Sequence, residues 1–533
     1  MRKFSSYGLI DNEIHYHVPR NKLIESAYSQ LIGDSPEKDG HYITVWAPRQ
    51  TGKTWIMREV VRRMQAAGGF EVGMITLQGA KGIEDQKEIL DIFVDELNEQ
   101  FKLDIPLIDR WQQVSTLFSR TYFEKPIILI IDEFDSLAEE FINAFANQFR
   151  TIHTKRSFDS ENTSIDKNIL LHGLALIGVQ SVLGIDNESG SPFNVQRSVH
   201  IPNLTADEVN NIFHSYMEES GQPIEQGVID QLFDETQGQP GLVSWFGELL
   251  TTKYNDHPDQ PITTAQFDRT LLWAFQGLPN NNVLNIISKA RMKPYDQQIL
   301  QLFKTDKPLK FSFDNRNLNF LYMNGAITIG EEADNLYAKF ASPFVQKRLF
   351  NYFTDELFPD PDNLYELFTD LSTIITDTHL DVGELARLYE NYIQQNSGWL
   401  FKNAPTRATD GRIFEAVYHF NFFAYLREFM RSYDSQVIPE FPTGNGKIDL
   451  LIQHAGQLYG LELKSFVNQR MYEKARTQAA KYARKLGIDE IWLIFFVDRV
   501  DDDNRRKYEI SYLDTGAPTQ PIIVQPRLIA VAT

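Results

Sequence analysis

Short runs of aliphatic and β-branched residues alternate with longer amphipathic patterns between Tyr42 and about Ile201. This alternation predicts strand–helix units that form a mainly parallel sheet with helices on both faces. The predicted strands are ITVWA (43–47), FEVGMITL (70–77), IILIID (127–132), ILLHGLALIGV (169–179) and RSVHI (197–201).

The pattern changes after this region. Residues 204–277 have helical periodicity, and Thr205 with Glu208 has the spacing of a capping box. Residues 285–355 predict two or three helices, followed by FLYMNGAITIG (320–330) and NLYAKFAS (335–342) as two short strands around a turn, the order of a winged-helix domain. Acidic helices from 355 to about 400 resemble a connector, and an apolar helix followed by strands predicts a separate C-terminal α/β unit. The expected domain ranges are 1–203, 204–280, 281–355, 356–408 and 409–533.

Composition restricts the possible functions. The 533 residues include 52 Lys plus Arg against 72 Asp plus Glu, a net charge of −20, so any contact with nucleic acid must be local. The absence of cysteine excludes disulfides, thiolate zinc sites, iron–sulfur clusters and cysteine nucleophiles. No stretch reaches the roughly 18 apolar residues that a membrane span needs. We therefore expect a soluble, cytoplasmic protein with no membrane contact.

The first candidate site follows the first predicted strand. The segment from Ala47 to Thr54 stands between strand ITVW and helical pattern WIMREVVRRM, the order of a phosphate-binding loop. Backbone N–H groups of such a loop point at phosphate oxygens, Lys53 neutralises charge on the β- and γ-phosphates, and Thr54 can place its hydroxyl on Mg²⁺. Ala47 replaces the first glycine of the motif. The expected nucleotide-binding residues here are Arg49, Gln50, Thr51, Gly52, Lys53 and Thr54.

A second apolar strand supports the nucleotide site. Residues 126–133 (PIILIIDE) end in adjacent carboxylates and resemble a Walker B segment. In that interpretation Asp132 holds Mg²⁺ through water and Glu133 polarises the attacking water. The alternative is a buried strand that simply ends in an acidic turn.

With both segments in this order, residues 1 to about 355 resemble AAA-type ATPases, in particular the branch with the signal-transducing STAND ATPases and the bacterial predicted AAA-ATPases. The resemblance implies that ATP and Mg²⁺ are bound. It also implies that the segment His17–Arg20 lies near the adenine, although a plain loop entering a helix is the alternative there. Gln180 or Ser181 would be a polar sensor. A lid motif would pack Pro240 against the base, with a simple turn made by Gly and Pro as the alternative. A neighbouring subunit would supply an arginine finger, for which the candidates are Arg150, Arg156 and Arg197.

The second candidate site lies in a predicted hairpin, residues 447–464. If His454 and Gln457 close the turn, Asp449 and Glu462 face each other across the strands with Cβ atoms about 5 Å apart. Lys464, two residues past Glu462, points to the same face.

Two carboxylates this close repel each other unless a cation lies between them. Mg²⁺ or Mn²⁺ would suit Asp449, Glu462 and the backbone carbonyl of Leu463 as ligands. Lys464 would then orient the nucleophile or stabilise developing charge during phosphodiester hydrolysis. The alternative is an ordinary surface hairpin carrying an ion-paired Asp, Glu and Lys.

The spacing Asp-x12-Glu-x-Lys resembles the PD-(D/E)xK nuclease superfamily, with Ile448 where the family usually has proline. Gln478 and Tyr482, one helical turn apart, resemble the Gln-x-x-x-Tyr helix of RecB-like nucleases, which implies a catalytic role for Gln478. The resemblance also implies that Glu415, on the preceding helix, assists the metal. From Lys464 to Lys485 there are seven basic residues and one acidic residue, so a phosphate backbone could bind at 464–485.

The sequence thus predicts an α/β protein with a P-loop AAA-type ATPase core, a helical lid, a winged helix and a separate restriction-endonuclease-like domain. The leading hypothesis is a nucleotide-regulated, metal-dependent nuclease acting on DNA, with family analogy suggesting prokaryotic defence. The alternative is a STAND-like signalling or scaffolding ATPase whose inactive nuclease fold only binds DNA or protein; a DNA-translocating motor is less favoured. Self-association through the arginine finger and a basic protein partner for the acidic linker helices are also expected.

Overall fold

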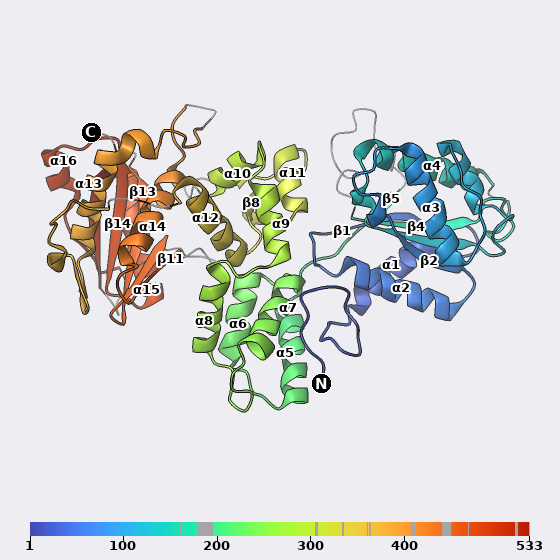
Figure 1. Ribbon diagram of the computed structural model, residues 1–533, viewed down its shortest axis with the longest axis horizontal. Coiled ribbons are helices and arrows are strands. Elements are labelled where there is room, and N and C mark those ends of the chain that lie inside the picture. The colour runs from blue at the N-terminus through green and yellow to red at the C-terminus, as the bar shows by residue number, and fades with distance from the viewer. Residues whose placement is uncertain are drawn as a thin grey trace. The chain divides into compact units, whose positions relative to one another are not determined.

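The computed structural model divides into two compact units, which are described separately (Figure 1). The first comprises residues 1–233, 237–270 and 312–325, and the second comprises 234–236, 271–311 and 326–533. The structure describes residues 1–159, 161–178, 196–303, 308–332, 335–359, 361, 364–407, 411–439, 449–466, 468–516 and 521–531.

A five-stranded parallel sheet in the order β2-β3-β4-β1-β5 forms the centre of the first unit. Its strands coincide with the five apolar runs expected from the sequence, so that prediction is confirmed. Consecutive residues of β3 point to opposite faces: Leu129 packs with Phe93 and Phe145 from α3 and α4, whereas Ile130 packs with Met57 from α2. Both faces are covered, which explains why β3 is apolar along nearly its whole length.

A helical segment follows the sheet in the first unit. Thr205 caps α5 by accepting from the N–H of Glu208, whose side chain accepts in return from the N–H of Thr205, as the capping-box prediction requires. Pro240 occupies the first turn of α7, where its missing N–H costs nothing.

The elements assigned mainly to the first unit have the following bounds. They are α1 (Asn21–Ile32), β1 (Tyr42–Trp46), α2 (Lys53–Ala67), β2 (Glu71–Thr76), η1 (Gln78–Ala80), α3 (Gln86–Phe101), η2 (Trp111–Phe118), β3 (Ile127–Asp132), η3 (Phe134–Ser136), α4 (Glu139–Phe158), β4 (Leu171–Ile177), β5 (Gln196–His200), α5 (Ala206–Ser220), α6 (Gln226–Thr236), α7 (Pro240–Glu248), the π-helical segment η4 (Leu249–Lys253), α8 (Thr264–Phe275) and α11 (Arg316–Met323).

The second unit begins with helices α9 and α10 and an antiparallel sheet in the order β6-β8-β7. The expected strand at 320–330 is wrong in its first half, because Phe320–Met323 end helix α11 and β7 starts only at Ile327. Asn315 caps α11 through the N–H of Leu318, and the positive φ of Gly325 separates the helix from the strand.

The expected run of acidic connector helices is also only partly present. Helix α12 ends at Leu357, and the next α-helix among the described residues is α13, which starts at Val382. Pro359 and Pro361 cannot continue the first helix, and a 3-10 turn followed by the short strand pair β9–β10 precedes the second.

The C-terminal part of the second unit is built on a six-stranded sheet in the order β11-β12-β13-β14-β16-β15. Strands β13, β14 and β16 are parallel and the others are antiparallel. Leu493 and Phe495 of β14 pack with helix α15 on one face of the sheet. On the opposite face Phe496 contacts Phe422 of α14. This mixture of helices and strands agrees with the α/β pattern expected after residue 409, whereas the expected separate domain stays a prediction, because these elements belong to the same compact unit as α9, α10, α12 and α13.

The elements assigned to the second unit have the following bounds. They are α9 (Asn281–Ala290), α10 (Tyr295–Leu302), β6 (Leu309–Lys310), β7 (Ile327–Glu332), β8 (Asn335–Phe340), α12 (Pro343–Leu357), η5 (Leu371–Thr373), β9 (Ile375–Thr376), β10 (His379–Leu380), α13 (Val382–Leu400), α14 (Glu415–Met430), β11 (Ser435–Pro439), β12 (Leu450–His454), β13 (Gln457–Ser465), α15 (Gln469–Leu486), β14 (Glu490–Val497), α16 (Asp502–Tyr508), β15 (Tyr512–Asp514) and β16 (Ile522–Ala530). Among the described helices of both units, none has the length and apolar character needed to cross a membrane.

Candidate functional site

The loop between β1 and α2 has the conformation of a phosphate-binding loop. Within residues 47–54, all of which are described, positive φ angles occur at Gln50 (56°) and Gly52 (88°). Ala47 lies outside the left-handed region, so the position where the motif usually has glycine tolerates a Cβ here. Helix α2 starts at Lys53, which places its free N–H groups at the loop.

Lys53 lies beneath this loop. Its Nζ donates to the carbonyl oxygens of Ala47 at 2.8 Å and Pro48 at 2.9 Å. Burial lowers the pKa of Lys53, and the nearby carboxylates of Asp135 and Asp132 oppose that shift. The ammonium group is thus held at the cavity by carbonyl dipoles and acidic neighbours.

Thr54 and Asp132 form the expected pair at the end of the neighbouring strand. The Thr54 hydroxyl donates to Asp132 Oδ2 at 2.8 Å. Glu133 follows with a φ of 53°, so the chain turns sharply directly after β3. Thr54 and Asp132, the two residues predicted to hold Mg²⁺, therefore lie in contact. Glu133 is exposed and lines the same cavity.

The cavity contains an acidic residue that the sequence analysis overlooked. Asp135 lines it, and a Cβ added to Gly178 would lie only 2.4 Å from Asp135 Oδ1, so the carboxylate is packed against the end of β4. Burial, and then the charge of Glu133, raise the pKa of Asp135 to about 6. The available signal was a third acidic side chain two residues after Glu133.

The predicted lid motif contacts the loop directly. Gln239 Nε2 donates to the carbonyl oxygens of Arg49 at 3.0 Å and Gln50 at 3.3 Å. The N–H of Gly241 donates to the Gln50 carbonyl at 3.0 Å. Pro240, between them, lines the same cavity. The loop and the N-terminus of α7 therefore form one wall of the cavity.

A further part of the cavity lining was not predicted. Ser5, Ser6, Gly8, Leu9 and Ile10 line the cavity, whose volume is about 340 Å³. Sequence patterns gave no signal for this segment, because its position depends on tertiary contacts such as the hydrogen bond from Gln50 Nε2 to the carbonyl of Ser6.

The segment His17–Arg20, expected beside the adenine, does not line this cavity. Instead, the Arg20 guanidinium donates to the carbonyl oxygens of Pro202 at 2.6 Å and Asn203 at 3.2 Å. His17 packs against the ring of Trp55, with 5.4 Å between the ring centroids. The side chains of Arg20 and His17, which were expected beside the adenine, therefore contact backbone carbonyls and the Trp55 ring instead.

The remaining predictions for this site have different outcomes. Gln180 and Ser181 lie outside the described residues. Arg156 is wrong as an arginine finger, because it is 3% exposed and pairs with Asp39 at 3.0 Å. Arg150 and Arg197 are exposed and stay predictions.

The C-terminal hairpin has the predicted register. His454 pairs with Gln457, and Leu450 pairs with Leu461. Asp449 and Glu462 are the next residues along the two strands, so this register agrees with the predicted one. Ala455 and Gly456 form the turn with φ angles of 52° and 76°, as a two-residue hairpin loop of the I′ type requires.

The two acids and the lysine of this hairpin gather at one point. Lys464 Nζ lies 2.9 Å from Glu462 Oε1 and 3.9 Å from Asp449 Oδ2. Asp449 also accepts a hydrogen bond of 2.7 Å from the N–H of Leu463. Burial lowers the pKa of Lys464, but Glu462 and Asp449 outweigh this effect and raise the pKa above its ordinary value. The lysine is thus a permanent cation between two carboxylates.

Of two more predicted residues, Glu415 contacts the strand that carries Lys464, and Gln478 contacts its own helix. Glu415, at the start of α14, accepts a hydrogen bond of 2.7 Å from the N–H of Ser465 and adds negative charge near Lys464. Gln478 Nε2 donates to the Tyr482 hydroxyl at 2.5 Å on α15. Glu462 pairs in register with Leu493, which faces α15, so the acid points to the α15 side of the sheet.

The basic segment 464–485 is only partly available to a ligand. Lys464 is buried, and Arg484 pairs with Asp514 at 2.5 Å. Arg476 is stacked on the rings of Tyr472 and Tyr512 at 5.0 and 4.3 Å. The basic side chains of this segment exposed to solvent are Arg470, Lys474, Lys481 and Lys485.

The described residues contain no group of three or more His, Asp or Glu side chains arranged as a metal site.

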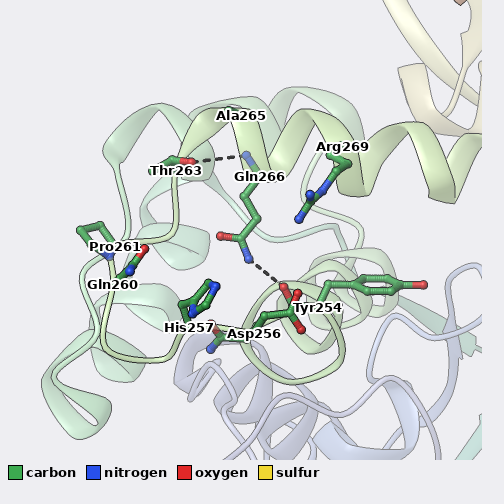
Figure 2. A pocket seen from close by; sticks show the side chains of 10 residues that line it. Tyr254, Asp256, His257, Gln260, Pro261, Thr263, Ala265, Gln266 and Arg269 are labelled. Carbon is green, nitrogen blue, oxygen red and sulfur yellow. Dashed lines mark hydrogen bonds between the residues drawn. The ribbon is translucent and has the colours of Figure 1, made fainter. Parts of the chain in front are cut away.

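Figure 2 shows a second cavity of the first unit, about 290 Å³ in volume and lined by polar side chains including His257, Gln266 and Arg269, where Gln266 Nε2 donates to the Tyr254 carbonyl at 2.9 Å. None of the predicted site residues lines it.

Comparisons with known proteins give one family match and several similar solved structures. None of the curated proteins matches the chain. A Walker-type ATPase of Pyrococcus abyssi is 15% identical over 65% of this chain and 99% of its own, with a TM-score of 0.39. The Orc1 protein of Aeropyrum pernix in complex with DNA is 13% identical over 64% and 95%, with a TM-score of 0.34. The RuvB Holliday junction branch migration motor of Thermotoga maritima is 12% identical over 60% and 92%, with a TM-score of 0.33.

Identities and TM-scores this low transfer no activity. The match to a protein family is more informative, because residues 6–271 match the family described as AAA-like domain, and this range contains the segments predicted as phosphate-binding loop, Walker B strand and lid motif. Residues 6–271 of this chain are therefore similar to the AAA-like domain family.

Proposed function

We propose that this chain is a nucleotide-regulated nuclease, in which the AAA-like domain binds and hydrolyses ATP and the C-terminal α/β unit hydrolyses phosphodiester bonds of DNA. The observation that carries the proposal is the convergence of Asp449 and Glu462 on Lys464 Nζ at the end of a hairpin. In this proposal the parts of the chain are a core (1–203), a lid (204–280), a winged helix (281–355), a connector (356–408) and a nuclease domain (409–533).

The donor set at the C-terminal site suits Mg²⁺ or Mn²⁺. Asp449 and Glu462 lie 3.9 and 2.9 Å from one ammonium group, on which the charge of Glu415 also acts, so the buried cluster carries excess negative charge that a divalent cation would offset. Carboxylate oxygens, with the carbonyl of Leu463, are the hard ligands that these ions prefer. A bound cation would polarise the scissile phosphate and lower the pKa of a bound water.

The other residues of this site have roles that follow from their positions. Lys464 keeps its proton because of its two acidic neighbours, so it can stabilise negative charge that develops on the phosphate but cannot act as a general base. Gln478, on the α15 side of the sheet with its amide nitrogen donating to Tyr482, can position a phosphate or a water. Arg470 and Lys474, exposed on the same helix, would bind the DNA backbone.

At the nucleotide site Lys53 and the N–H groups at the start of α2 would neutralise the phosphates. The hydroxyl of Thr54 and the carboxylate of Asp132, already joined by a hydrogen bond, would hold Mg²⁺, and Glu133 would polarise the attacking water. Because Gln239 connects the lid to the loop, bound ATP can change the lid position.

A cleavage assay tests the proposal. We expect the full chain to cut plasmid or single-stranded DNA with Mg²⁺ or Mn²⁺ and to lose that activity in EDTA. Asp449→Asn should reduce the rate by at least about 10²-fold, since it removes one of the carboxylate ligands. Lys474→Gln, on the exposed face of α15, serves as a control that weakens DNA binding and leaves the chemical step intact. Equal cleavage by Asp449→Asn and the wild type would refute the assignment.

A STAND-like signalling or scaffolding ATPase is the second candidate, and the burial of the C-terminal cluster favours it. Asp449 is 7% exposed, Lys464 6% and Glu462 0%, so a substrate could reach these groups only after the site opens. In this alternative the C-terminal unit binds DNA or protein without cutting. ATP hydrolysis that depends on Lys53, together with no cleavage under any metal condition, would support it.

A further inference from the structure

Arg20 links the core of the first unit to the segment that leads from β5 into α5. Its backbone carbonyl starts helix α1 by accepting from the N–H groups of Leu23 and Ile24. The side chain of Ile24 packs with the sheet in the core cluster. The Arg20 guanidinium, by contrast, donates to the carbonyl oxygens of Pro202 and Asn203, which lie between β5 and α5. The backbone of Arg20 is therefore fixed to the core, and its side chain holds the connecting segment.

The contact of Arg20 with this segment is bidentate and shielded from solvent. Two of its guanidinium nitrogens donate to consecutive carbonyl oxygens, at 2.6 and 3.2 Å. Its Nε lies 3.5 Å from Glu208 Oε1 in the first turn of α5, and the side chain is 8% exposed. Burial lowers the pKa of Arg20, and the charge of Glu208 opposes that shift. Because the guanidinium is a rigid, planar fork of donors, it selects one backbone conformation at Pro202 and Asn203.

The connecting segment is joined in turn to the predicted lid motif, residues 237–241. The N–H of Leu204 donates to the carbonyl of Gly238 at 2.8 Å, and Asn203 Nδ2 donates to the carbonyl of Gln237 at 3.0 Å. Gly238 has a φ of 68°, and a Cβ at this position would lie 2.0 Å from the carbonyl oxygen of Leu204. The two backbones thus approach as closely as only glycine permits. A change of backbone conformation at 202–204 would therefore displace the motif.

The predicted lid motif continues directly into the nucleotide cavity. Gln239 Nε2 donates to two carbonyl oxygens of the predicted phosphate-binding loop, and Pro240 and Gly241 line the cavity. Arg20 is not among the residues that line it. A continuous path of hydrogen bonds and peptide bonds therefore connects Arg20 with residues at the cavity, although Arg20 does not reach the cavity itself.

We propose that Arg20 is a positioning residue for nucleotide binding, which holds Pro240 and Gly241 at the cavity through the backbone of Pro202 and Asn203. The inference rests on the proposed function in one respect, namely that this cavity binds ATP. Without the fork, the connecting segment samples other conformations, and the arrangement that binds ATP is populated for a smaller fraction of the time. The apparent Kd rises in inverse proportion to that fraction. Arg20 thus controls the affinity for a ligand that it does not touch.

Calorimetric titration of the full chain with a non-hydrolysable ATP analogue tests this role. We expect Arg20→Gln to raise the Kd about 10-fold, because an amide cannot contact both carbonyl oxygens and Glu208. Arg20→Lys keeps the charge but has no fork, so its Kd should fall between those of Arg20→Gln and the wild type. Arg62→Gln is the matched control, since Arg62 is 71% exposed and pairs with Glu59 on its own helix. Its Kd should stay within about twofold of the wild-type value.

A double-mutant cycle with Gln239 separates positioning from a general effect on the fold. Gln239→Ala, at the other end of the path, should also weaken binding about 10-fold, and independent effects would multiply to about 100-fold in the double variant. If both residues hold the same motif, the double variant binds within about threefold of the weaker single variant. A purely structural Arg20 would lower the unfolding midpoint of Arg20→Gln and leave the affinity of the folded protein unchanged.

The results distinguish this inference from the proposed function. A Kd of Arg20→Gln equal to that of the wild type, or a double variant weakened about 100-fold, would overturn the positioning role and leave ATP binding in place. A wild type that does not bind the analogue would overturn ATP binding, and the positioning role with it. Neither result depends on whether the C-terminal unit cleaves DNA.

Discussion

The hydroxyl of Thr54 donates to Asp132 Oδ2 at 2.8 Å, although 78 residues separate them in the chain. One belongs to the first turn of α2 and the other ends β3. The hydrogen bond therefore joins the start of α2, after the predicted phosphate-binding loop, to the end of β3, the predicted Walker B strand. With Lys53 beside them, these residues form the part of the AAA-like domain on which the first prediction depends.

Lys53→Ala should reduce ATP hydrolysis by at least about 10²-fold, because the variant lacks the ammonium group that neutralises phosphate charge during transfer. The measurement is release of inorganic phosphate under saturating ATP. Lys81→Ala, at an exposed position in the same domain, should leave the rate within about twofold. Full hydrolysis by Lys53→Ala would mean that this loop is not the reaction site.

Gly241→Ala should weaken ATP binding by separating the lid from the loop. A Cβ at this position would lie 2.5 Å from Gln50 Oε1 and 2.7 Å from Gln50 Cβ, so the loop residue must shift. We expect the dissociation constant of a non-hydrolysable ATP analogue to rise about 10-fold, by isothermal titration. Gly79→Ala is the matched control, because its added methyl group would meet nothing within 4 Å. Identical affinities in the two variants would show that the lid contact does not shape the site.

Lys464→Met should destabilise the fold by about 3–5 kcal/mol, because removing one partner of a buried ion pair leaves the other charge uncompensated. Glu462, which would remain, is 0% exposed. Urea unfolding measures the loss, and Lys474→Met on the exposed face of α15 should change stability by less than about 0.5 kcal/mol. Mg²⁺ should restore part of the stability of Lys464→Met, and no restoration would argue against a cation site between Asp449 and Glu462.

His172 should make stability depend on pH. Its Nε2 must donate to the carbonyl of Ile32 at 2.9 Å, so Nδ1 of the neutral ring accepts from Ser164 at 2.8 Å. Burial, opposed by that hydrogen bond to Ile32, lowers the pKa of His172 from its ordinary value of 6.5 to about 4. Between these values the unfolded chain binds more protons, so stability rises with pH and falls as the pH decreases.

We expect the wild type to lose about 2 kcal/mol of unfolding free energy from this residue between pH 7 and pH 5. His172→Gln has no imidazole to titrate, so it should not show this loss. The difference in unfolding free energy between the wild type and His172→Gln should therefore be about 2 kcal/mol smaller at pH 5 than at pH 7. Urea unfolding at both pH values measures the difference, with His214→Gln, at an exposed position, as the control. An equal pH dependence in His172→Gln and the wild type would exclude His172 as the cause.

The sequence predicted those parts of the fold in which the local hydrophobic pattern matches the burial of the side chains. The strand IILIID is apolar on both faces because helices cover both faces, and the capping box at Thr205 and Glu208 depends on a three-residue spacing. The hairpin register was predictable because a two-residue turn fixes every pair that follows. By contrast, FLYM was assigned to a strand, and the cap at Asn315 shows that local hydrogen bonding favours a helix there.

The candidate sites were predictable only as far as sequence motifs define them. Asp449, Glu462 and Lys464 lie within one hairpin, so their proximity follows from short-range geometry. The contribution of Ser6 to the nucleotide cavity depends on contacts with Gln50, far away in the chain. The packing of Asp135 against Gly178 requires two neighbouring strands to end at the same level, which periodicity does not specify.

The turn at Ala455 and Gly456 sets how tolerant the C-terminal cluster is of changes in chain length. Adding or deleting a single residue there would shift β12 by one position against β13, and side chains that now face the cluster would face the opposite side of the sheet. Asp449 would then be carried away from Lys464 without any change in its own identity. Evolution could silence this site by altering the length of a loop while every acid and lysine stayed in place.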